Sequence, residues 1–324
     1  MTSDRIRAAV EEALPSGYGG VASWHGPRTG EWSWTFRVET GGAAPATLLV
    51  KVPRWEDATD LADALAAGPQ QDTEEEYRAL EAIAAAVAAS GDPGLAAVVP
   101  VAYVPEVNAI VTELLRARPL RDRLRGGRGG RSASAYFRRA GRWLAVFHGS
   151  GDRRPRPFLP GEADDFDQIA AHLGGSLGQA ASDLVAAGRV LTGRPTLEVV
   201  AHGDFSMANI LVTIDDRVAV VDPNRYRARP SADVAHLLIE ARLSRRQLLS
   251  AGIGRRRRTV EAWAAAMSEG YPELDPVLLS YDRAAAAVRR WAEVEERLRG
   301  VGRVALVPAR RLLRSEVASL LEGI

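Results

Sequence analysis

The chain changes character near residue 115, and this change constrains its fold more than any other feature. Before that point, short runs of aromatic and β-branched residues surround turns rich in glycine and proline, which is typical of strands. After it, long segments read as helices, and a strand-like island interrupts them at 199–222. The pattern predicts an α+β protein with a small β-rich lobe, residues 1–115, and a larger mainly helical lobe, residues 116–324.

Turn residues indicate where the elements of each lobe begin and end. In the first lobe, strands at 21–24 and 31–38 flank an expected turn at 26–30, and the run 47–52 follows a second turn. A helix is expected over 73–89, because Asp72 and Thr73 precede Glu74, Glu75 and Glu76, and acidic residues suit a helix N-terminus. The helices expected in the second lobe cover 135–148, 166–187, 230–242, 257–269, 276–299 and 308–321.

Lys51 is the only lysine among the 42 lysine and arginine residues of the chain. A coding bias explains the general use of arginine, so a position that stays lysine is one where a guanidinium does not serve. Lysine carries a compact point charge, whereas arginine carries a broad planar fork, and lysine is a common phosphate ligand. Lys51 also lies in the apolar run 47–52, which is typical of a buried strand. On this residue alone, an ordinary surface lysine remains the alternative.

Composition excludes several classes of protein. The 324 residues are 46% hydrophobic and 26% charged, as in an ordinary globular protein, and the formal charge of +1 gives no drive toward nucleic acid or membranes. No apolar run is long enough for a transmembrane helix. Without cysteine the chain has no disulfide and no thiolate chemistry, and a cytoplasmic location is expected. The arginine-rich stretch Arg116–Arg142 is interpreted as a surface stretch rather than a nucleic-acid site.

The residues with the clearest chemistry lie in the island at 199–222. Asp204 and Asn209 are five residues apart in an H-x-D-x-x-x-x-N pattern, and Asp222 ends the strand that follows a hairpin. This order is the active-site layout of kinases. One carboxylate accepts or orients the proton of the acceptor hydroxyl, while an amide and a second carboxylate converge on magnesium, which prefers oxygen ligands.

His202-Gly203-Asp204 with Asn209, ahead of Val221-Asp222, resembles the aminoglycoside phosphotransferase and choline kinase family. Members of this family have a protein-kinase-like, bilobal fold and phosphorylate small molecules, and they have glycine, as at Gly203, where protein kinases have arginine. Further matches occur in the family's order: Lys51 in the third strand, 74–80 at the start of the next helix, 111–114 at the hinge under the adenine, 144–148 in the helix before the catalytic loop, and Asp233 after the metal-binding segment.

The resemblance implies a role for each matched residue. Asp204 would be the catalytic base, with Asn209 and Asp222 as the ligands of Mg²⁺. His202 would brace the catalytic loop by hydrogen bonding. The remaining histidines are interpreted as packing residues: His25, His148, His172 and His236.

The same resemblance assigns the nucleotide-binding residues. Lys51 would contact the α- and β-phosphates of ATP or GTP and be held by a glutamate of the following helix. Glu76 fits this glutamate best, because in the family it directly precedes the tyrosine and aliphatic residues of the helix, and Glu75 is the alternative. Successive residues of a helix point about 100° apart, so only one of them can face the lysine. Glu113 and Leu114 would lie at the hinge under the adenine.

The chain departs from the kinase pattern at two points. No G-x-G-x-x-G precedes Lys51, so the phosphate loop is assigned only weakly to Gly26–Gly30, with Gly17, Gly19 and Gly20 as the alternative. The segment from Asp222 to the helix expected at residue 230 is too short to present a protein substrate, which favours a small acceptor.

The sequence offers three groups that could contact the acceptor, although each is also typical of ordinary surface or core. An acidic cluster would suit a cationic acceptor, an arginine cluster an anionic one, and helix-borne aromatics a sugar or a quaternary amine. The members are Glu162, Asp164, Asp165 and Asp167; Arg225, Arg227 and Arg229; and Trp263, Tyr281 and Trp291.

Together these features predict an ATP- or GTP-dependent O-phosphotransferase. It would transfer the γ-phosphoryl group to a hydroxyl of an aminoglycoside, a sugar or aminosugar, a choline-like amine or another small metabolite. The alternative is a pseudokinase or nucleotide-binding regulatory module of the same fold. A protein kinase is disfavoured by the short segment after Asp222. No membrane or nucleic-acid partner is expected.

Overall fold

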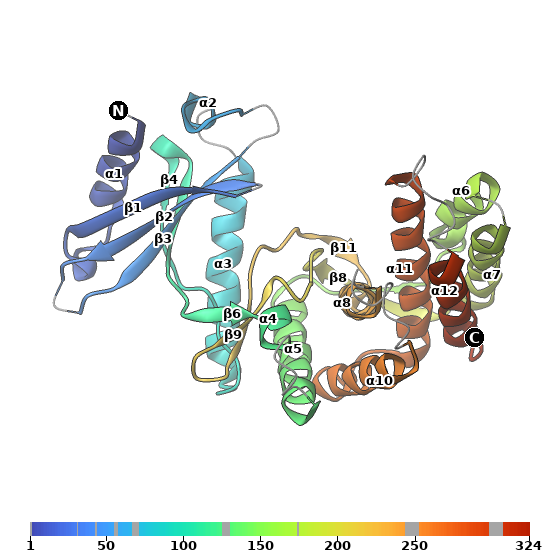
Figure 1. Ribbon diagram of the computed structural model, residues 1–324. Coiled ribbons are helices and arrows are strands. Elements are labelled where there is room, and N and C mark those ends of the chain that lie inside the picture. The colour runs from blue at the N-terminus through green and yellow to red at the C-terminus, as the bar shows by residue number, and fades with distance from the viewer. Residues whose placement is uncertain are drawn as a thin grey trace. The chain divides into compact units, whose positions relative to one another are not determined.

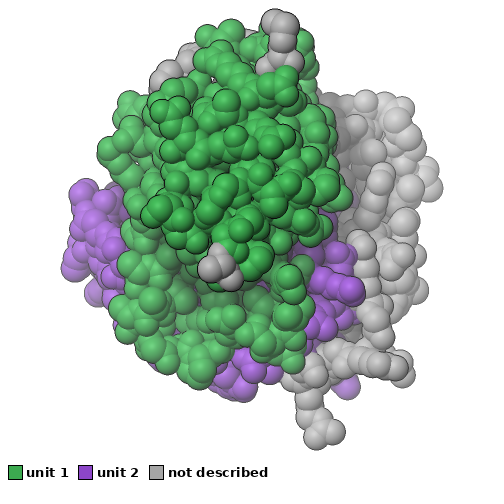
Figure 2. Space-filling view, turned by 90° about the vertical axis from the view of Figure 1, so that its left-hand side faces the viewer, with its two compact units in different colours: residues 1–117, 213–219 green, residues 118–212, 220–324 purple. Residues whose placement is uncertain are grey.

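A computed structural model describes residues 2–30, 32–42, 44–54, 58–66, 71–124, 130–173, 175–243, 253–297 and 307–324. The chain forms two compact units (Figure 2). Unit 1 comprises residues 1–117 and 213–219, and unit 2 comprises residues 118–212 and 220–324. Within the described ranges, no helix combines the length and the hydrophobicity needed to cross a membrane.

Unit 1 is built on a five-stranded antiparallel sheet in the order β1-β2-β3-β5-β4 (Figure 1). Alternate residues of each strand point to opposite faces of the sheet, so one face carries the core of the unit and the other carries more polar residues. The core face includes Phe36, Val50 and Val111, all fully buried. The strands are β1 (Val21–Thr29), β2 (Ser33–Thr40), β3 (Thr47–Pro53), β4 (Pro100–Val104) and β5 (Ala109–Glu113).

Helices lie on both sides of this sheet (Figure 1). The amphipathic helix α1 (Thr2–Ala13) buries Ile6 and Val10, spaced four residues apart, against the core face. The short helix α2 (Leu61–Ala66) adds Ala64 and Leu65 to the same core. The longer helix α3 (Gln71–Ser90) lies on the opposite face of the sheet, where its Glu76 accepts a hydrogen bond from Lys51. The expected helix 73–89 is therefore confirmed, whereas α1 was not anticipated.

The turn expected at Gly26–Gly30 is wrong, because β1 continues through these residues to Thr29. Arg28 and Thr29 pair with Thr35 and Trp34 of β2, and the ladder shifts register between His25 and Arg28. Glycine and proline here mark a bulge in the strand rather than its end. The chain reverses later, where Gly30 N–H donates to the Ser33 carbonyl at 2.7 Å.

Unit 2 contains most of the helices; each expected segment is helical, but one of them is divided in two and α4 was not expected. The single helix expected over 166–187 is two helices, α6 (Asp164–Leu173) and α7 (Gly175–Leu191); Gly175 has a φ of 57°, which does not continue a helix. The other helices are α4 (Leu120–Leu124), α5 (Gly130–Ser150), α8 (Pro230–Leu243), α10 (Ile253–Gly270), α11 (Pro276–Arg297) and α12 (Val307–Leu321).

Two small three-stranded sheets accompany these helices, in the orders β10-β9-β6 and β11-β8-β7. They position the loops of the candidate site, because β8 ends immediately before His202 and β9 begins immediately after Asn209. The strands are β6 (Ala117–Pro119), β7 (Arg154–Pro157), β8 (Pro195–Ala201), β9 (Ile210–Thr213), β10 (Val218–Val220) and β11 (Tyr226–Ala228).

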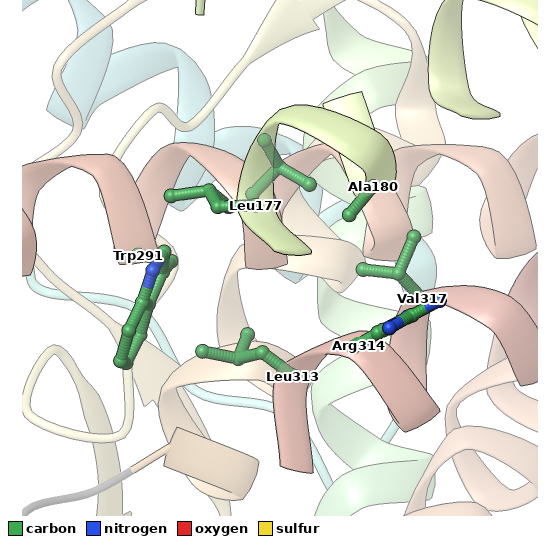
Figure 3. A pocket seen from close by; sticks show the side chains of 7 residues that line it. Leu177, Ala180, Trp291, Leu313, Arg314 and Val317 are labelled. Atoms are coloured by element: carbon green, nitrogen blue, oxygen red, sulfur yellow. The ribbon is translucent and has the colours of Figure 1, made fainter. Parts of the chain in front are cut away.

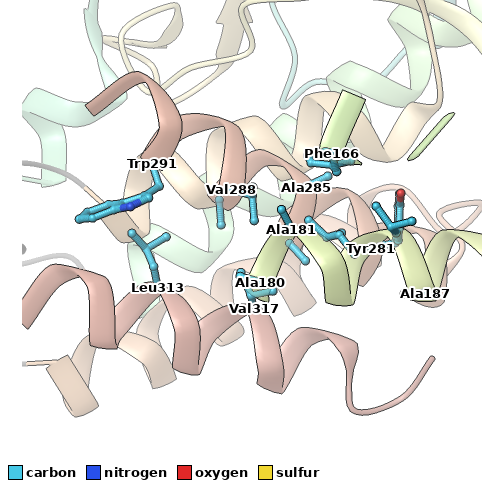
Figure 4. Close-up of a cluster of buried hydrophobic side chains, with 14 of the residues drawn as sticks. Phe166, Ala180, Ala181, Ala187, Tyr281, Ala285, Val288, Trp291, Leu313 and Val317 are labelled. Carbon is cyan, nitrogen blue, oxygen red and sulfur yellow. The ribbon is translucent and has the colours of Figure 1, made fainter. Parts of the chain in front are cut away.

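In unit 2, side chains of α6, α7, α11 and α12 form an apolar cluster (Figure 4). Ala180 and Ala181 of α7 and Val288 of α11 let these helices approach closely, while Trp291 and Leu313 fill the end of the cluster. A small cavity of about 10 Å³ remains beside Trp291, with Arg314 at its edge (Figure 3). The space is about that of a single water and is lined by core residues, so we interpret it as a packing defect.

Candidate functional site

Lys51 lies in the middle of β3, on the sheet face opposite the core. Leu48, Val50 and Val52 alternate with it and are fully buried in the core of unit 1. Its neighbours across the sheet are Thr35 on β2 and Ile110 on β5. The ammonium group is therefore carried by a strand that is held on both sides, which fixes its position.

The first turns of α3 supply the partner of this lysine. Nζ of Lys51 donates to Oε1 of Glu76 at 2.8 Å, and both side chains are about three-quarters buried, with exposed fractions of 25% and 23%. The adjacent carboxylates point elsewhere: Glu75 accepts from Nε2 of Gln71 at 2.7 Å, and Glu74 pairs with Arg78. Of the two candidates from the sequence, Glu76 is thus the residue that contacts Lys51.

Glu113 and Leu114, expected at the hinge, use their polar groups within unit 1. Glu113 is in register with Leu48, so its side chain is on the core face, opposite Lys51. There its Oε1 accepts from the hydroxyl of Tyr18 at 2.9 Å; burial, together with this hydrogen bond, raises the pKa of Tyr18 to about 12. Leu114 N–H donates to the Thr47 carbonyl at 2.8 Å. The Glu113 carboxylate is therefore a structural group, and a contact with a nucleotide would involve its main chain.

In unit 2, the loop between β8 and β9 folds back on itself around Asp204. The Nδ2 group of Asn209 donates to the carboxylate Oδ2 of Asp204 at 2.8 Å and to its main-chain carbonyl at 3.1 Å. Both of these partners are acceptors, so the amide must turn its NH₂ toward Asp204 and its Oδ1 away from it. Ser206 N–H also donates to the Asp204 carbonyl, at 2.9 Å. The Asp204 side chain is held at a defined place while half of its surface, 52%, stays exposed.

Gly203 is required by the packing of this loop. Its φ is +83°, in the region that side chains rarely adopt, and a β-carbon there would collide with the carbonyl oxygen of Asn224 and lie 2.9 Å from Cε1 of Tyr226. Asn224 N–H in turn donates to the His202 carbonyl at 2.7 Å. The segment after Asp222 therefore lies directly against the residue that precedes Asp204.

His202 holds the loop from inside the core. The ring is fully buried and lies within about 6 Å of the rings of Trp143, Phe147 and Phe205. Burial lowers the pKa of His202, because the protonated ring would lose its hydration, and the negative charges of nearby aspartates only partly oppose this. His202 contacts its surroundings through hydrogen bonds of its main chain and through packing of its buried ring.

Asp233 of α8 fixes the loop by two hydrogen bonds to its main chain. Oδ2 accepts from His202 N–H at 2.7 Å, and Oδ1 accepts from Gly203 N–H at 2.9 Å. Oδ2 is also 3.0 Å from Nε2 of the fully buried His148. Burial alone would raise the pKa of Asp233, but the hydrogen bonds from His148 and the two N–H groups outweigh it and hold the pKa below its usual value.

Asp222 follows β10 and is tied to Asn209 through the main chain. Val221 N–H donates to the Asn209 carbonyl at 3.1 Å, so the two expected metal ligands lie on adjoining backbone segments. Asp222 has a φ of 57°, a left-handed conformation that costs a non-glycine residue on the order of 1 kcal/mol or more. Such strain is frequent at functional sites and points to a role for this side chain.

The side-chain oxygens of Asn209 and Asp222 are of the kind that binds Mg²⁺. The amide oxygen of Asn209 is turned away from Asp204, and Asp222 is exposed, so the two side chains would offer one neutral and one charged oxygen ligand. Within the described ranges, no group of three or more His, Cys, Asp or Glu side chains is arranged to hold a metal ion.

Sequence reasoning missed one residue beside Asp204. His236 of α8, interpreted as a packing residue, is half exposed, and its Nε2 lies 3.8 Å from Oδ1 of Asp204. Its spacing from Asp233 gave a clue, since residues three apart on a helix lie on the same side. Only the fold brings that side of α8 against the loop.

The glycines considered for a phosphate loop differ in their environments. Gly26 lies in the bulge of β1 and Gly30 at the turn into β2. Gly19 and Gly20 are at the other end of β1, where the carbonyl of Gly20 accepts from Gly41 N–H at 2.8 Å. Gly19 and Gly20 therefore help to join the turn before β1 to the turn after β2. This leaves Gly26 and Gly30 as the better candidates for a phosphate loop.

One member of each charged cluster proposed for the acceptor forms an ion pair with the other, Glu162 with Arg229. Arg229 forms ion pairs with Glu162 and Asp282 and is only 11% exposed, stacked over the ring of Phe158 at 4.8 Å. Arg227 donates to the carboxylate of Asp152 at 2.8 Å. Burial makes Arg229 and Glu162 structural, whereas the other members of the two clusters, Asp164, Asp165, Asp167, Arg225 and Arg227, are exposed.

The aromatic residues proposed for the acceptor are core residues. Trp291 and Tyr281 belong to the cluster around α11, and Trp263 stacks on Phe137 with ring centroids 4.5 Å apart. All three are nearly inaccessible to solvent. Of the arginine-rich stretch, residues 125–129 lie outside the described residues.

A sequence model of the phosphotransferase enzyme family matches residues 27–277, which is more than half of the chain. No curated protein sequence gives a significant match. The solved structures that are similar include a choline/ethanolamine kinase family protein from Mesorhizobium loti, 18% identical, with a TM-score of 0.51 over 99% of this chain and 95% of that one.

Two antibiotic kinases are also similar. A macrolide 2′-phosphotransferase from Brachybacterium faecium is 16% identical, with a TM-score of 0.54 over 99% of this chain and 98% of that one. Spectinomycin phosphotransferase, solved with ADP and spectinomycin, is 11% identical, with a TM-score of 0.53 over the same shares. At these identities the likeness shows the fold, which confirms the expected α+β kinase-like class.

Proposed function

Because the chain belongs to the phosphotransferase enzyme family, it is a small-molecule kinase, and we propose that it transfers the γ-phosphoryl group of ATP or GTP to a hydroxyl of a small acceptor. The observation that carries this proposal is the placement of Asp204. Its carboxylate is fixed by Asn209 on one side and half exposed on the other, on a loop that Asp233 anchors. A fixed, accessible carboxylate is what an acceptor hydroxyl needs as a base.

Lys51 and Glu76 support the nucleotide half of the proposal. Lys51 would bind the α- and β-phosphates with its ammonium group, while Glu76, at 2.8 Å, holds that group in place. The ammonium group is partly buried and paired, so its position is already fixed. Binding of the nucleotide therefore costs little side-chain entropy at this residue. Main-chain groups near Glu113 and Leu114 would face the adenine or guanine.

Asn209 and Asp222 are the residues that would hold Mg²⁺. When bound, the ion neutralises the charge of the phosphates during transfer. Asn209 thereby has two tasks, since its NH₂ orients Asp204 and its oxygen is free to turn toward the ion. Asp222 is set beside it by the hydrogen bond from Val221 to Asn209.

A small acceptor is supported by the short connection after Asp222. Only a few residues lead from it through β11 to α8 at Pro230, and β11 is paired with β8. The solved relatives include enzymes that bind spectinomycin and amicoumacin. We therefore place the acceptor among aminoglycosides, sugars, aminosugars, choline-like amines and other small hydroxylated metabolites. A nucleotide-dependent activity and a cysteine-free chain also fit the cytoplasmic location expected from the sequence.

Thermal unfolding with Mg²⁺ and either ATP or GTP tests the nucleotide site. A ligand at 100 times its dissociation constant adds about 2.7 kcal/mol to the native state, and each kcal/mol corresponds to roughly 2–4 °C for a chain of this size. Asp222→Asn is the matched variant, because asparagine tolerates the left-handed backbone and removes only the charge. We expect a magnesium-dependent shift in the wild type and its loss in the variant.

Turnover is tested separately with a panel of hydroxylated acceptors and ADP release as the readout. Asp204→Asn should keep the thermal shift and lose the acceptor-dependent release. Nucleotide binding without turnover of any acceptor, in the wild type, would instead favour a pseudokinase or regulatory module of this fold.

A further inference from the structure

A buried chain of hydrogen bonds runs from the catalytic loop to the residue that follows α10. The N–H groups of His202 and Gly203 donate to Asp233, whose Oδ2 is 3.0 Å from Nε2 of His148. The other ring nitrogen of His148, Nδ1, is 3.2 Å from the hydroxyl of Tyr271. His148, Asp233 and Tyr271 are all at most 2% exposed, so these contacts are shielded from solvent.

With a neutral His148 ring, the protons in this chain have one consistent arrangement. A carboxylate only accepts, so the His148 nitrogen facing Asp233 carries its proton, and a neutral ring then has an acceptor at Nδ1. Tyr271 must donate to that nitrogen. Burial raises the pKa of Tyr271, which keeps the hydroxyl protonated and able to donate. The tyrosine hydroxyl therefore selects the histidine tautomer that bonds to Asp233.

Close packing of α5 on α10 brings Tyr271 to His148. Gly141 of α5 and Gly270 of α10 touch backbone to backbone: a β-carbon on Gly141 would collide with the carbonyl of Met267, and one on Gly270 with the carbonyl of Arg138. Tyr271 directly follows Gly270, and its N–H donates to the Met267 carbonyl at 2.8 Å. The hydroxyl is thus held at a fixed distance from the histidine on the neighbouring helix.

We propose that Tyr271 is a positioning residue for the catalytic loop, acting through His148 and Asp233 on the two N–H groups that precede Asp204. Loss of its hydroxyl would leave Nδ1 of His148 without a donor, and the ring could take the other tautomer and lose its bond to Asp233. Asp233 would then hold the loop less firmly. This inference deepens the proposed function, on which its kinetic part rests.

Tyr271→Phe is the test, because it removes the hydroxyl and keeps the ring. Hydrogen–deuterium exchange should become about five- to tenfold faster at the amides of His202 and Gly203, the range of one buried hydrogen bond, with no change in the amides of α11. Tyr281→Phe is the matched control, since its hydroxyl is also buried but has no hydrogen-bond partner in the described part of the chain. It should leave the exchange of both regions unchanged.

The kinetic readout uses hydrolysis of Mg²⁺–ATP by water, which needs no identified acceptor. We expect Tyr271→Phe to lower kcat by about five- to tenfold with an unchanged KM for ATP, and His148→Gln combined with it to lower kcat no further. Equal exchange of the loop amides in Tyr271→Phe and wild type would overturn the proposal, even for an active enzyme. Faster exchange of those amides in a protein without any ATP turnover would support the positioning role and count against the kinase assignment alone.

Discussion

The carbonyl oxygen of Asn224 occupies the space that a β-carbon on Gly203 would need. Gly203→Ala should therefore displace the loop as well as strain its backbone at a φ of +83°. We expect a loss of about 2 kcal/mol or more in the free energy of unfolding, and a fall in activity that exceeds what reduced folding explains. Urea unfolding and ADP release measure the two effects.

Gly149→Ala provides the control for this substitution. Gly149 lies in α5 and has open space where a β-carbon would be placed. Alanine there should be neutral or stabilise the protein by up to about 1 kcal/mol. If both alanine variants were equally stable and active, the close contact with Asn224 would not govern the loop.

Lys51→Arg should impair the enzyme although it conserves the charge. The ammonium group bonds Glu76 at 2.8 Å on a strand that is fixed on both sides, and the longer, planar guanidinium cannot take the same position. We expect kcat/KM for ATP to fall about tenfold or more, with stability changed by less than about 1 kcal/mol. Arg7→Lys, in an exposed pair with Glu11, should change neither quantity.

Glu76→Gln and Glu75→Gln separate the two glutamates that the sequence left open. The first removes the carboxylate that accepts from Lys51, and the second removes one that accepts from Gln71 on the helix surface. We expect about a tenfold loss of kcat/KM for Glu76→Gln and none for Glu75→Gln, measured by ADP release. A loss in Glu75→Gln of the same size would contradict the assignment.

How much of the fold the sequence reveals depends on local pattern. The helix 73–89 and the long helices of unit 2 were predictable, because capping residues and apolar periodicity act within one segment. The error at Gly26 arose because glycine and proline punctuate a chain in general, while pairing with β2 carries the strand through them. Helix α1 was missed because its apolar stripe is narrow, with Ile6 and Val10 among charged residues.

The candidate site likewise has features that local sequence predicts and features that depend on contacts between distant elements. The positions of the catalytic motif could be named from spacing, and Glu76 from its place in the family's helix pattern, while the angle between successive helix residues meant that only one glutamate could face Lys51. The approach of His236 to Asp204 and the bond between Tyr271 and His148 depend on contacts between distant elements. The pairing of Glu162 with Arg229 is of this kind too, since it joins one member of each expected cluster in a largely buried ion pair. No local pattern carries such information.

Burial of His202 makes the stability of the protein depend on pH near neutrality. Its pKa in the folded state lies below 6.5, mainly because burial disfavours the charged ring, whereas the unfolded chain takes up a proton near 6.5. The unfolded state therefore binds more protons below pH 6.5, and the free energy of unfolding should fall as the pH drops from 6.5 toward the folded-state pKa. The slope is about 1.4 kcal/mol per pH unit for one proton.

His202→Phe isolates this contribution from that of the carboxylates. Phenylalanine fits the aromatic surroundings of Trp143, Phe147 and Phe205 and does not titrate. Denaturant unfolding of both proteins between pH 5.5 and 7.5 should show the wild type losing stability relative to the variant on the acid side of 6.5, with a constant difference above about pH 7. Parallel curves over the whole range would mean that the folded protein protonates His202 as readily as the unfolded chain does, contrary to its buried position.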